Sequence, residues 1–367
     1  MTETTEPIVR AVAGFGRYAS TAIPSAIPYV DGTWPNVLAR LEAERLTGLA
    51  VAAVESGELR LAADARGNLL ESHRRAMVHA LVLERNLCHL AAAFEEHGLE
   101  TVVLKGPALA HGFYEDPSWR PFGDLDLLVR TDQWRAVCGL LERQGLQREL
   151  PEPRPGFDQR FGKGAVFEGP DQVSIDLHRT LVAGPFVMWI DTAALFDHRV
   201  EFRVGGTRLW RLDDTGAFLH ACVNAALGSW RPMLLPVRDV VQVAQRGRVD
   251  WQRVARWSRS WRLSGVIRQA LEAANELLGA ELPAEARRLA VQPPSRAERR
   301  AMGAYTTTKR RRGGPALGTL AAIPGIRGKT AYARALLIPT RQFLAARGAG
   351  GTYRRRWAVP LRWLLGR

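Results

Sequence analysis

Two aspartates separated by one residue, Asp124 and Asp126, point most directly to chemistry in this chain. They lie in the segment 124–129, whose apolar composition predicts a short buried strand. Because successive side chains of a strand point to opposite faces, both carboxylates are expected on one face. Neighbouring carboxylates repel each other, and Mg²⁺ removes that repulsion by taking their oxygens as ligands. The alternative is a solvated strand face with two acids near a turn.

A strand, a turn and a short helix precede the aspartate pair. Residues 101–104 are rich in β-branched side chains and predict a buried strand. Gly106 then lets the backbone turn or approach a ligand closely. Pro107 suits the first position of a helix, which is predicted over 108–114. A D-x-D pattern alone is a weak signal, and this context strengthens it.

A third carboxylate comes from a hairpin predicted over residues 165–177. In its second strand, Ser174, Asp176 and His178 share one face, and apolar side chains share the other. Asp176 is the candidate third acid, with a surface strand acid as the alternative. His178 is a candidate to position a phosphate or an acceptor, and a structural histidine is the alternative.

The chain resembles the uncharacterised nucleotidyltransferase family, which belongs to the DNA polymerase β-like nucleotidyltransferase superfamily. The motifs that carry the resemblance are Leu104-Lys105-Gly106, Tyr114, Asp116-Pro117, Arg120 and Asp124-Leu125-Asp126-Leu127-Leu128-Val129. In that superfamily a glycine motif opens a helix, a D-x-D strand follows, and a neighbouring strand adds a third carboxylate. This sequence differs in having Lys-Gly-Pro where Gly-Ser is usual, and in the long interval between Gly106 and Asp124.

The resemblance implies metal-dependent transfer of a nucleoside monophosphate. Asp124 and Asp126 would hold Mg²⁺. Asp176, which matches the family's D/E-x-H motif, would bind a second ion on the acceptor side or act as base for the acceptor hydroxyl. Two such ions stabilise the attacking and leaving oxygens of an in-line displacement at phosphorus. The expected cofactor is therefore Mg²⁺, with two ions.

Four further residues are expected to bind the nucleotide. Lys105 and Arg120 are placed to offset the charge of the β- and γ-phosphates, Arg120 through its bidentate fork. The alternatives are a strand-end charge for Lys105 and a surface ion-pair partner for Arg120. Backbone amides at Gly106 and the helix start after it would add anion binding, and His178 completes the set. Lys163, between two glycines, is a further phosphate contact in one interpretation and a plain hairpin entry in the other.

Composition places the chain among globular proteins of more than one domain. Its 367 residues are long enough to bury a sizeable core, and 46% hydrophobic content excludes wholesale disorder. The three cysteines are far apart and share no metal-binding spacing, which is typical of a reducing compartment. No signal peptide and no apolar run of about 18 residues is evident. We therefore expect a cytoplasmic protein.

The net charge of +14 comes from one end of the chain. Residues 296–367 hold 17 Lys or Arg and one Glu, whereas the remainder holds 34 basic and 36 acidic residues. The basicity is thus a property of the C-terminal tail and not of the candidate site. Its mixture of cations with apolar and aromatic residues suits a packed helix, a membrane surface or RNA.

These patterns predict an α+β fold, with a polymerase β-like nucleotidyltransferase α/β core between N-terminal helices and a C-terminal helical domain. The expected organisation is a loosely ordered lead-in over 1–33, a helical segment over 34–98, the nucleotidyltransferase core over 99–212, a helical domain over 213–292, and a basic tail over 293–367.

The predicted function is transfer of a nucleoside monophosphate from a nucleoside triphosphate, with ATP as the default, to an unidentified hydroxyl. The acceptor is a small molecule, a protein or an RNA, all of which fit the same metal chemistry. One alternative is a catalytically inactive protein that binds nucleotide or nucleic acid through the basic tail. Another is a protein whose tail contacts a membrane surface weakly.

Overall fold

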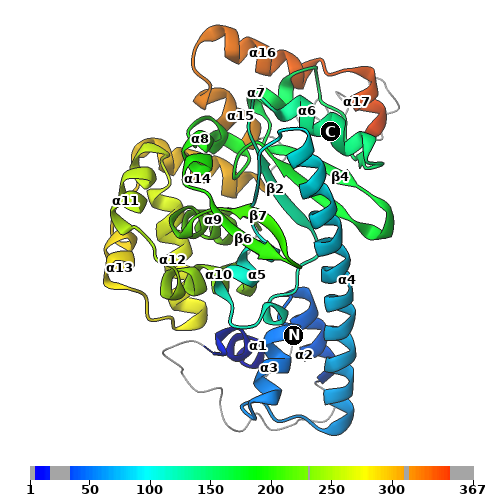
Figure 1. The fold of residues 1–367 in the computed structure, drawn as a ribbon. Coiled ribbons are helices and arrows are strands. Elements are labelled where there is room, and N and C mark those ends of the chain that lie inside the picture. Colours follow the sequence, from blue (N-terminus) through cyan, green and yellow to red (C-terminus); the bar gives the residue numbers. More distant parts are fainter. Residues whose placement is uncertain (1–4, 17–33, 230–231, 310–313, 348–367) are drawn as a thin grey trace, which may run out of the picture.

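A seven-stranded mixed sheet forms the centre of the molecule, with the strand order β3-β4-β5-β2-β1-β7-β6 (Figure 1). The computed structural model describes residues 5–16, 34–229, 232–309 and 314–347. The strands are β1 (Thr101–Val103), β2 (Leu125–Val129), β3 (Gln147–Arg148), β4 (Gly164–Glu168), β5 (Ser174–His178), β6 (Val200–Val204) and β7 (Thr207–Arg211). Together with the many helices, this mixed sheet confirms the predicted α+β class.

Helices surround the sheet and extend beyond it. The first group is α1 (Thr5–Gly14), α2 (Trp34–Ala43), α3 (Thr47–Glu55), α4 (Ala63–Glu96), α5 (Pro107–Phe113), α6 (Trp134–Arg143), α7 (Phe157–Phe161) and α8 (Thr192–Asp197). The second group is α9 (Asp214–Leu227), α10 (Leu234–Arg246), α11 (Trp251–Ser260), α12 (Ser264–Leu278), α13 (Ala284–Ala290), α14 (Arg296–Lys309), α15 (Gly314–Ala322), α16 (Ile326–Leu337) and α17 (Arg341–Ala346). Single 3₁₀ turns are η1 (Pro117–Trp119), η2 (Pro170–Gln172) and η3 (Gly184–Met188).

The register of the central strands decides which side chains meet. β2 runs antiparallel to β1 and parallel to β5, and Asp126 lies directly opposite Asp176. The strand predicted over 101–104, the helix over 108–114 and the hairpin over 165–177 all form, within one or two residues at their ends. Asp124 lies one residue before β2, at the end of the preceding loop, and not on the strand as predicted.

Two hydrophobic cores cover the two faces of the sheet. Leu125, Leu127 and Val129 pack on one side against α6 and the C-terminal half of α4. Leu128 lies on the other side, in a core shared with the N-terminal helices and with α9, α10 and α12. Side-chain alternation along β2 therefore directs Asp126 toward the second core, as the apolar pattern predicts. The helices predicted as a separate domain over 213–292 share this core with the sheet.

The first residues differ from the loosely ordered lead-in that was predicted for 1–33. Helix α1 forms there, and its Val9, Val12 and Ala13 are buried. The Arg238 side chain from α10 donates to the carbonyl groups of Ala13 and Phe15 at 3.1 and 2.7 Å. Apolar spacing of three and four residues gives α1 a face to bury, and this outweighs the polar residues around it.

Part of the predicted basic tail is also packed structure. Helix α16 contributes Tyr332 to a small core with Phe161 of α7 and Ile323. The sequence clusters 310–312, 354–357 and 361–365 lie outside the described residues. Within the described residues, no helix combines the length and the apolar composition that crossing a membrane requires.

Candidate metal and nucleotide site

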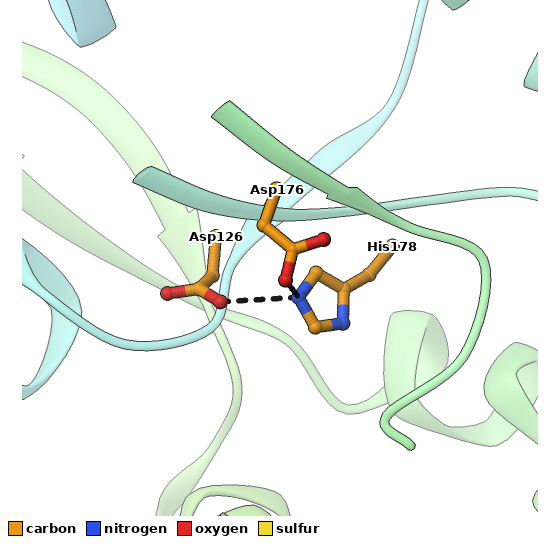
Figure 2. Close-up of side chains that lie close together, drawn as sticks. All are labelled: Asp126, Asp176 and His178. Atoms are coloured by element: carbon orange, nitrogen blue, oxygen red, sulfur yellow. Dashed lines mark hydrogen bonds and ion pairs between the residues drawn. The ribbon is translucent and has the colours of Figure 1, made fainter. Parts of the chain in front are cut away.

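Asp126 and Asp176 face each other across adjacent parallel strands, and His178 completes the group (Figure 2). The His178 Nε2 atom lies 3.1 Å from Asp126 Oδ1 and 3.1 Å from Asp176 Oδ2. One residue, Leu177, separates Asp176 from His178 on β5, so the strand alternation presents both to Asp126. Of the three carboxylates expected to converge, Asp126 and Asp176 meet, whereas Asp124 lies outside this group and His178 completes it.

The donor set fits a divalent cation. His178 Nδ1 lies 3.2 Å from the Thr180 carbonyl oxygen, and its Nε2 atom faces both carboxylates. With a cation bound in place of the Nε2 proton, Nδ1 would donate to Thr180 and Nε2 would serve as the ligand. The three ligand atoms lie within 4.8 Å of one another, close enough to share one ion.

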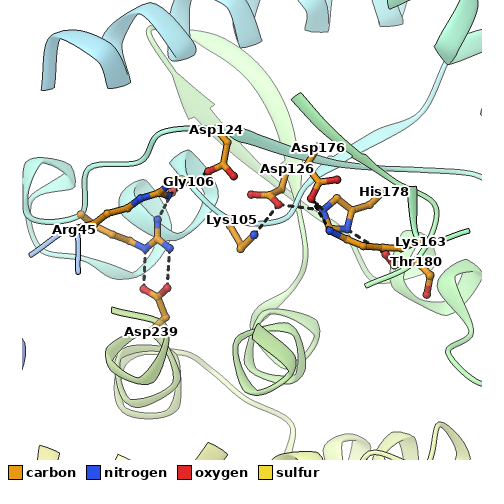
Figure 3. A network of polar contacts seen from close by, with 11 residues as sticks. Arg45, Lys105, Gly106, Asp124, Asp126, Lys163, Asp176, His178, Thr180 and Asp239 are labelled. Carbon is orange, nitrogen blue, oxygen red and sulfur yellow. Dashed lines mark hydrogen bonds and ion pairs between the residues drawn. The ribbon is translucent and has the colours of Figure 1, made fainter. Parts of the chain in front are cut away.

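Two lysines neutralise these carboxylates (Figure 3). Lys105 Nζ lies 2.7 Å from Asp126 Oδ1, and Lys163 Nζ lies 2.5 Å from Asp176 Oδ2. Burial acts to raise the pKa of Asp126, but Lys105 and His178 hold this pKa well below its usual value. Burial likewise acts on Asp176, and His178 and Lys163 hold its pKa well below the usual value. Both carboxylates are therefore ionised, as metal ligands must be.

A second histidine lies near this group and is kept neutral. His220 of α9 is buried, and its ring lies 6.5 Å from that of His178, centre to centre. Burial, followed by the nearby charges of Lys105 and His178, lowers the pKa of His220 to about 3. The neutral ring adds no positive charge to a region that already contains two lysines.

A pocket of about 280 Å³ opens beside Asp126. Asp124 and Lys105 line it together with Asp126, and helices α9 and α10 contribute residues such as Asn224 to the opposite wall. Asp176 and His178 do not line this pocket, so Asp126 is the link between the pocket and the three-residue group.

Asp124 is held differently from the other two acids. Its side chain is 37% exposed, and its Oδ1 atom accepts a hydrogen bond of 3.3 Å from Arg45 Nη1. Arg45 is 50% exposed and also lines the pocket. Its backbone has φ of 56°, in the turn between α2 and α3. No pattern in the sequence around Arg45 indicates that this turn reaches a site some 80 residues away.

The glycine turn lies at the pocket wall. Gly106 has φ of 52°, which favours glycine, and a side chain there would lie 3.2 Å from Phe122 Cγ. Pro107 lacks an N–H group, and the Ala108 amide donates to the Lys105 carbonyl at 3.1 Å. This start of α5 therefore offers fewer free amides to an anion than the sequence indicates.

Arg120 lines the pocket, but its charge is already paired. Its Nε and Nη2 atoms donate to the two carboxylate oxygens of Asp239 at 2.7 Å each, and both side chains are buried. The Tyr114 hydroxyl donates to the same carboxylate at 2.8 Å, and Arg120 Nη1 faces the Gly106 carbonyl at 3.5 Å. The expected bidentate contact of Arg120 with phosphate is therefore replaced by a contact with α10.

A mixed sheet that pairs two strand carboxylates and places one of them, Asp126, at a pocket beside a glycine turn is the arrangement expected for a nucleotidyltransferase. The chain belongs to the family described as "Uncharacterised nucleotidyltransferase", whose model matches residues 31–279. This confirms the resemblance that the sequence motifs indicate. The matched range 31–279 includes all the residues that line the pocket and the group of Asp126, Asp176 and His178.

One solved structure and the curated proteins complete the comparison. The crystal structure of an antigenic nucleotidyltransferase-like protein from Paracoccidioides brasiliensis is similar over 56% of this chain and 95% of its own, with 13% sequence identity and a TM-score of 0.33. None of the curated proteins matches the chain.

Proposed function

We propose that this protein transfers a nucleoside monophosphate from a nucleoside triphosphate, ATP by default, to a hydroxyl-bearing acceptor. The observation that carries the proposal is the meeting of Asp126, Asp176 and His178 behind a pocket that contains Lys105. Membership of a nucleotidyltransferase family supports the same reaction class.

Asp126, Asp176 and His178 would hold one Mg²⁺ ion, and Asp124 would help Asp126 to hold a second. Bound Mg²⁺ would neutralise the carboxylates and polarise phosphate oxygens. Asp176 is the more exposed of the two facing carboxylates, and its lowered pKa suits a metal ligand on the acceptor side better than a base for the acceptor hydroxyl. His178 keeps its Nε2 atom aimed at both carboxylates through its Nδ1 contact with Thr180.

Lys105 and Arg45 would bind the triphosphate. Lys105 lies on the pocket wall, where its three donors suit phosphate oxygens. Among the residues that the structure describes, the Arg45 guanidinium makes one hydrogen bond, of 3.3 Å with Asp124, and it lines the pocket where a ligand would meet its other donors. Arg120, which was expected in this role, would instead hold the Gly106 turn against α10 through Asp239.

The test is turnover of each labelled nucleoside triphosphate with Mg²⁺ and a cell extract that supplies acceptors. We expect Asp126→Asn/Asp176→Asn to lower transfer at least about 100-fold while the protein stays folded, since two metal-ligating carboxylates are lost. Asp64→Asn, a change of the same kind at an exposed position on α4, is the matched control. Unchanged transfer in the double variant would exclude this mechanism.

The alternative function is binding of nucleotide or nucleic acid without catalysis. It is favoured by the strongly basic segment 296–367, which holds 17 basic residues and one acidic residue. Calorimetry separates the two functions. An enzyme binds Mg-ATP through the pocket, so Lys105→Met weakens binding, whereas a tail-dependent binder loses a salt-sensitive interaction with RNA when the tail is removed.

A further inference from the structure

Helix α16 lies at the periphery of the molecule (Figure 1), and it exposes a stripe marked by apolar side chains at its two ends. Ile326 is 75% exposed and Leu337 is 48% exposed. They are eleven residues apart, which is three turns of a helix, so they lie on nearly the same line along its surface. Ile338, directly after the helix, is 51% exposed. Thr330 lies between the two ends and turns its hydroxyl back to the Arg327 carbonyl at 3.0 Å, so it needs no outside partner.

Cations flank this stripe on both sides. At about 100° per residue, Lys329 falls on one side of the line through Ile326 and Leu337, and Arg327 and Arg334 fall on the other. None of these three cations makes an ion pair with a carboxylate of the described residues. The sequence contains no Asp or Glu from residue 299 to residue 367, so no acidic residue of this segment competes for them.

The opposite face of α16 is anchored, which fixes the direction of the stripe. Tyr332 stacks on Phe157 at 5.6 Å and meets Phe161 edge-on at 5.3 Å, centre to centre. At the end of the helix, the Arg154 Nε atom donates to the Ile338 carbonyl at 2.7 Å. The apolar stripe therefore cannot turn inward without breaking these contacts.

We propose that this face of α16, formed by Ile326, Leu337 and Ile338 with Arg327, Lys329 and Arg334, binds the surface of an anionic lipid membrane. Exposed aliphatic residues flanked by Lys329 on one side and by Arg327 and Arg334 on the other are the pattern of a helix that lies in the membrane interface. The exposed apolar residues are aliphatic and offer no ring on which a nucleic acid base stacks. A second copy of this face, or the basic residues 348–367, carries the same charge and would be repelled.

Vesicle co-sedimentation of the full chain tests the proposal, with vesicles of phosphatidylcholine alone or mixed with phosphatidylglycerol. We expect binding to the anionic vesicles only. Each cation near an anionic surface contributes about fivefold to binding, so Arg327→Glu/Arg334→Glu should weaken binding at least about 25-fold. Ile326→Ser/Leu337→Ser should weaken binding by at least about tenfold, because apolar area no longer enters the interface.

Matched controls come from the exposed face of α4. Arg66→Glu/Arg85→Glu makes the same change in net charge, and Val78→Ser/Leu81→Ser removes aliphatic residues of similar exposure. Both controls should bind as the unchanged protein does. The proposal is overturned if the α16 variants bind like the controls. It is also overturned if Arg327→Glu/Arg334→Glu abolishes binding to a labelled single-stranded RNA while Ile326→Ser/Leu337→Ser leaves vesicle binding intact, which would indicate a nucleic acid partner.

Discussion

The ion pair between Arg120 and Asp239 should be among the most costly polar contacts to break. Both side chains are buried, and the pair has two hydrogen bonds of 2.7 Å. Asp239→Asn leaves the Arg120 charge buried without its counter-charge, and such a loss costs about 3–5 kcal/mol of unfolding free energy. Asp124→Asn, which breaks the exposed pair with Arg45, should cost about 0–1 kcal/mol.

Urea unfolding in the presence of a chelator measures both variants without a contribution from bound metal. A double variant, Arg120→Met/Asp239→Asn, should recover part of the loss, because the Arg120 charge is removed together with its partner and the amide still accepts from the Tyr114 hydroxyl. The reasoning is refuted if Asp239→Asn costs no more than Asp124→Asn, or if the double variant is less stable than Asp239→Asn.

Three further predictions concern the pocket and its neighbours. Arg45→Met should weaken Mg-ATP binding about 10- to 100-fold, as measured by calorimetry, because hydrogen bonds from a charged donor to phosphate are lost. The melting temperature should not change, and an equal loss of Mg-ATP affinity in the exposed control Arg85→Met would contradict the prediction. Gly106→Ala should lower the free energy of unfolding by about 1–3 kcal/mol, because the alanine side chain is strained at a positive φ and presses against Phe122. An unchanged free energy of unfolding in denaturant would show that the turn relaxes to accept the methyl group. His220 has a pKa of about 3 in the fold and about 6.5 when unfolded, so the unfolded chain binds more protons between these values. Stability should therefore fall by up to about 1.4 kcal/mol per pH unit from pH 6.5 to 4.5, and His220→Asn should remove that part of the slope; an unchanged slope would show that His220 is not the group.

The meeting of Asp126 and Asp176 could be predicted because it depends on local patterns. Alternation along each strand decides the face on which each carboxylate lies, and the family motif places the two strands in one site. The parallel register that puts them directly opposite each other depends on how two distant segments pair, and no local pattern carries that information.

The partners of Arg120 and Asp124 could not be predicted from the sequence. Arg120 meets Asp239 across 119 positions, and Arg45 meets Asp124 across 79, so each contact results from helix packing. Helix α1 is a different case. Its Val9, Val12 and Ala13 have helical spacing, but glycine, proline and serine in the residues that follow favoured a loosely ordered segment.

One helix belongs to both hydrophobic cores. The first turns of α4 place Ala65 and Leu69 in the core that includes the N-terminal helices, and its second half places residues from Ala80 to Phe94 in the core on the opposite face of the sheet. A helix forms cooperatively, so loss of its packing at one end weakens its hold at the other. We therefore expect damage to either core to reach both the pocket wall that carries Arg45 and the strands that carry the acids.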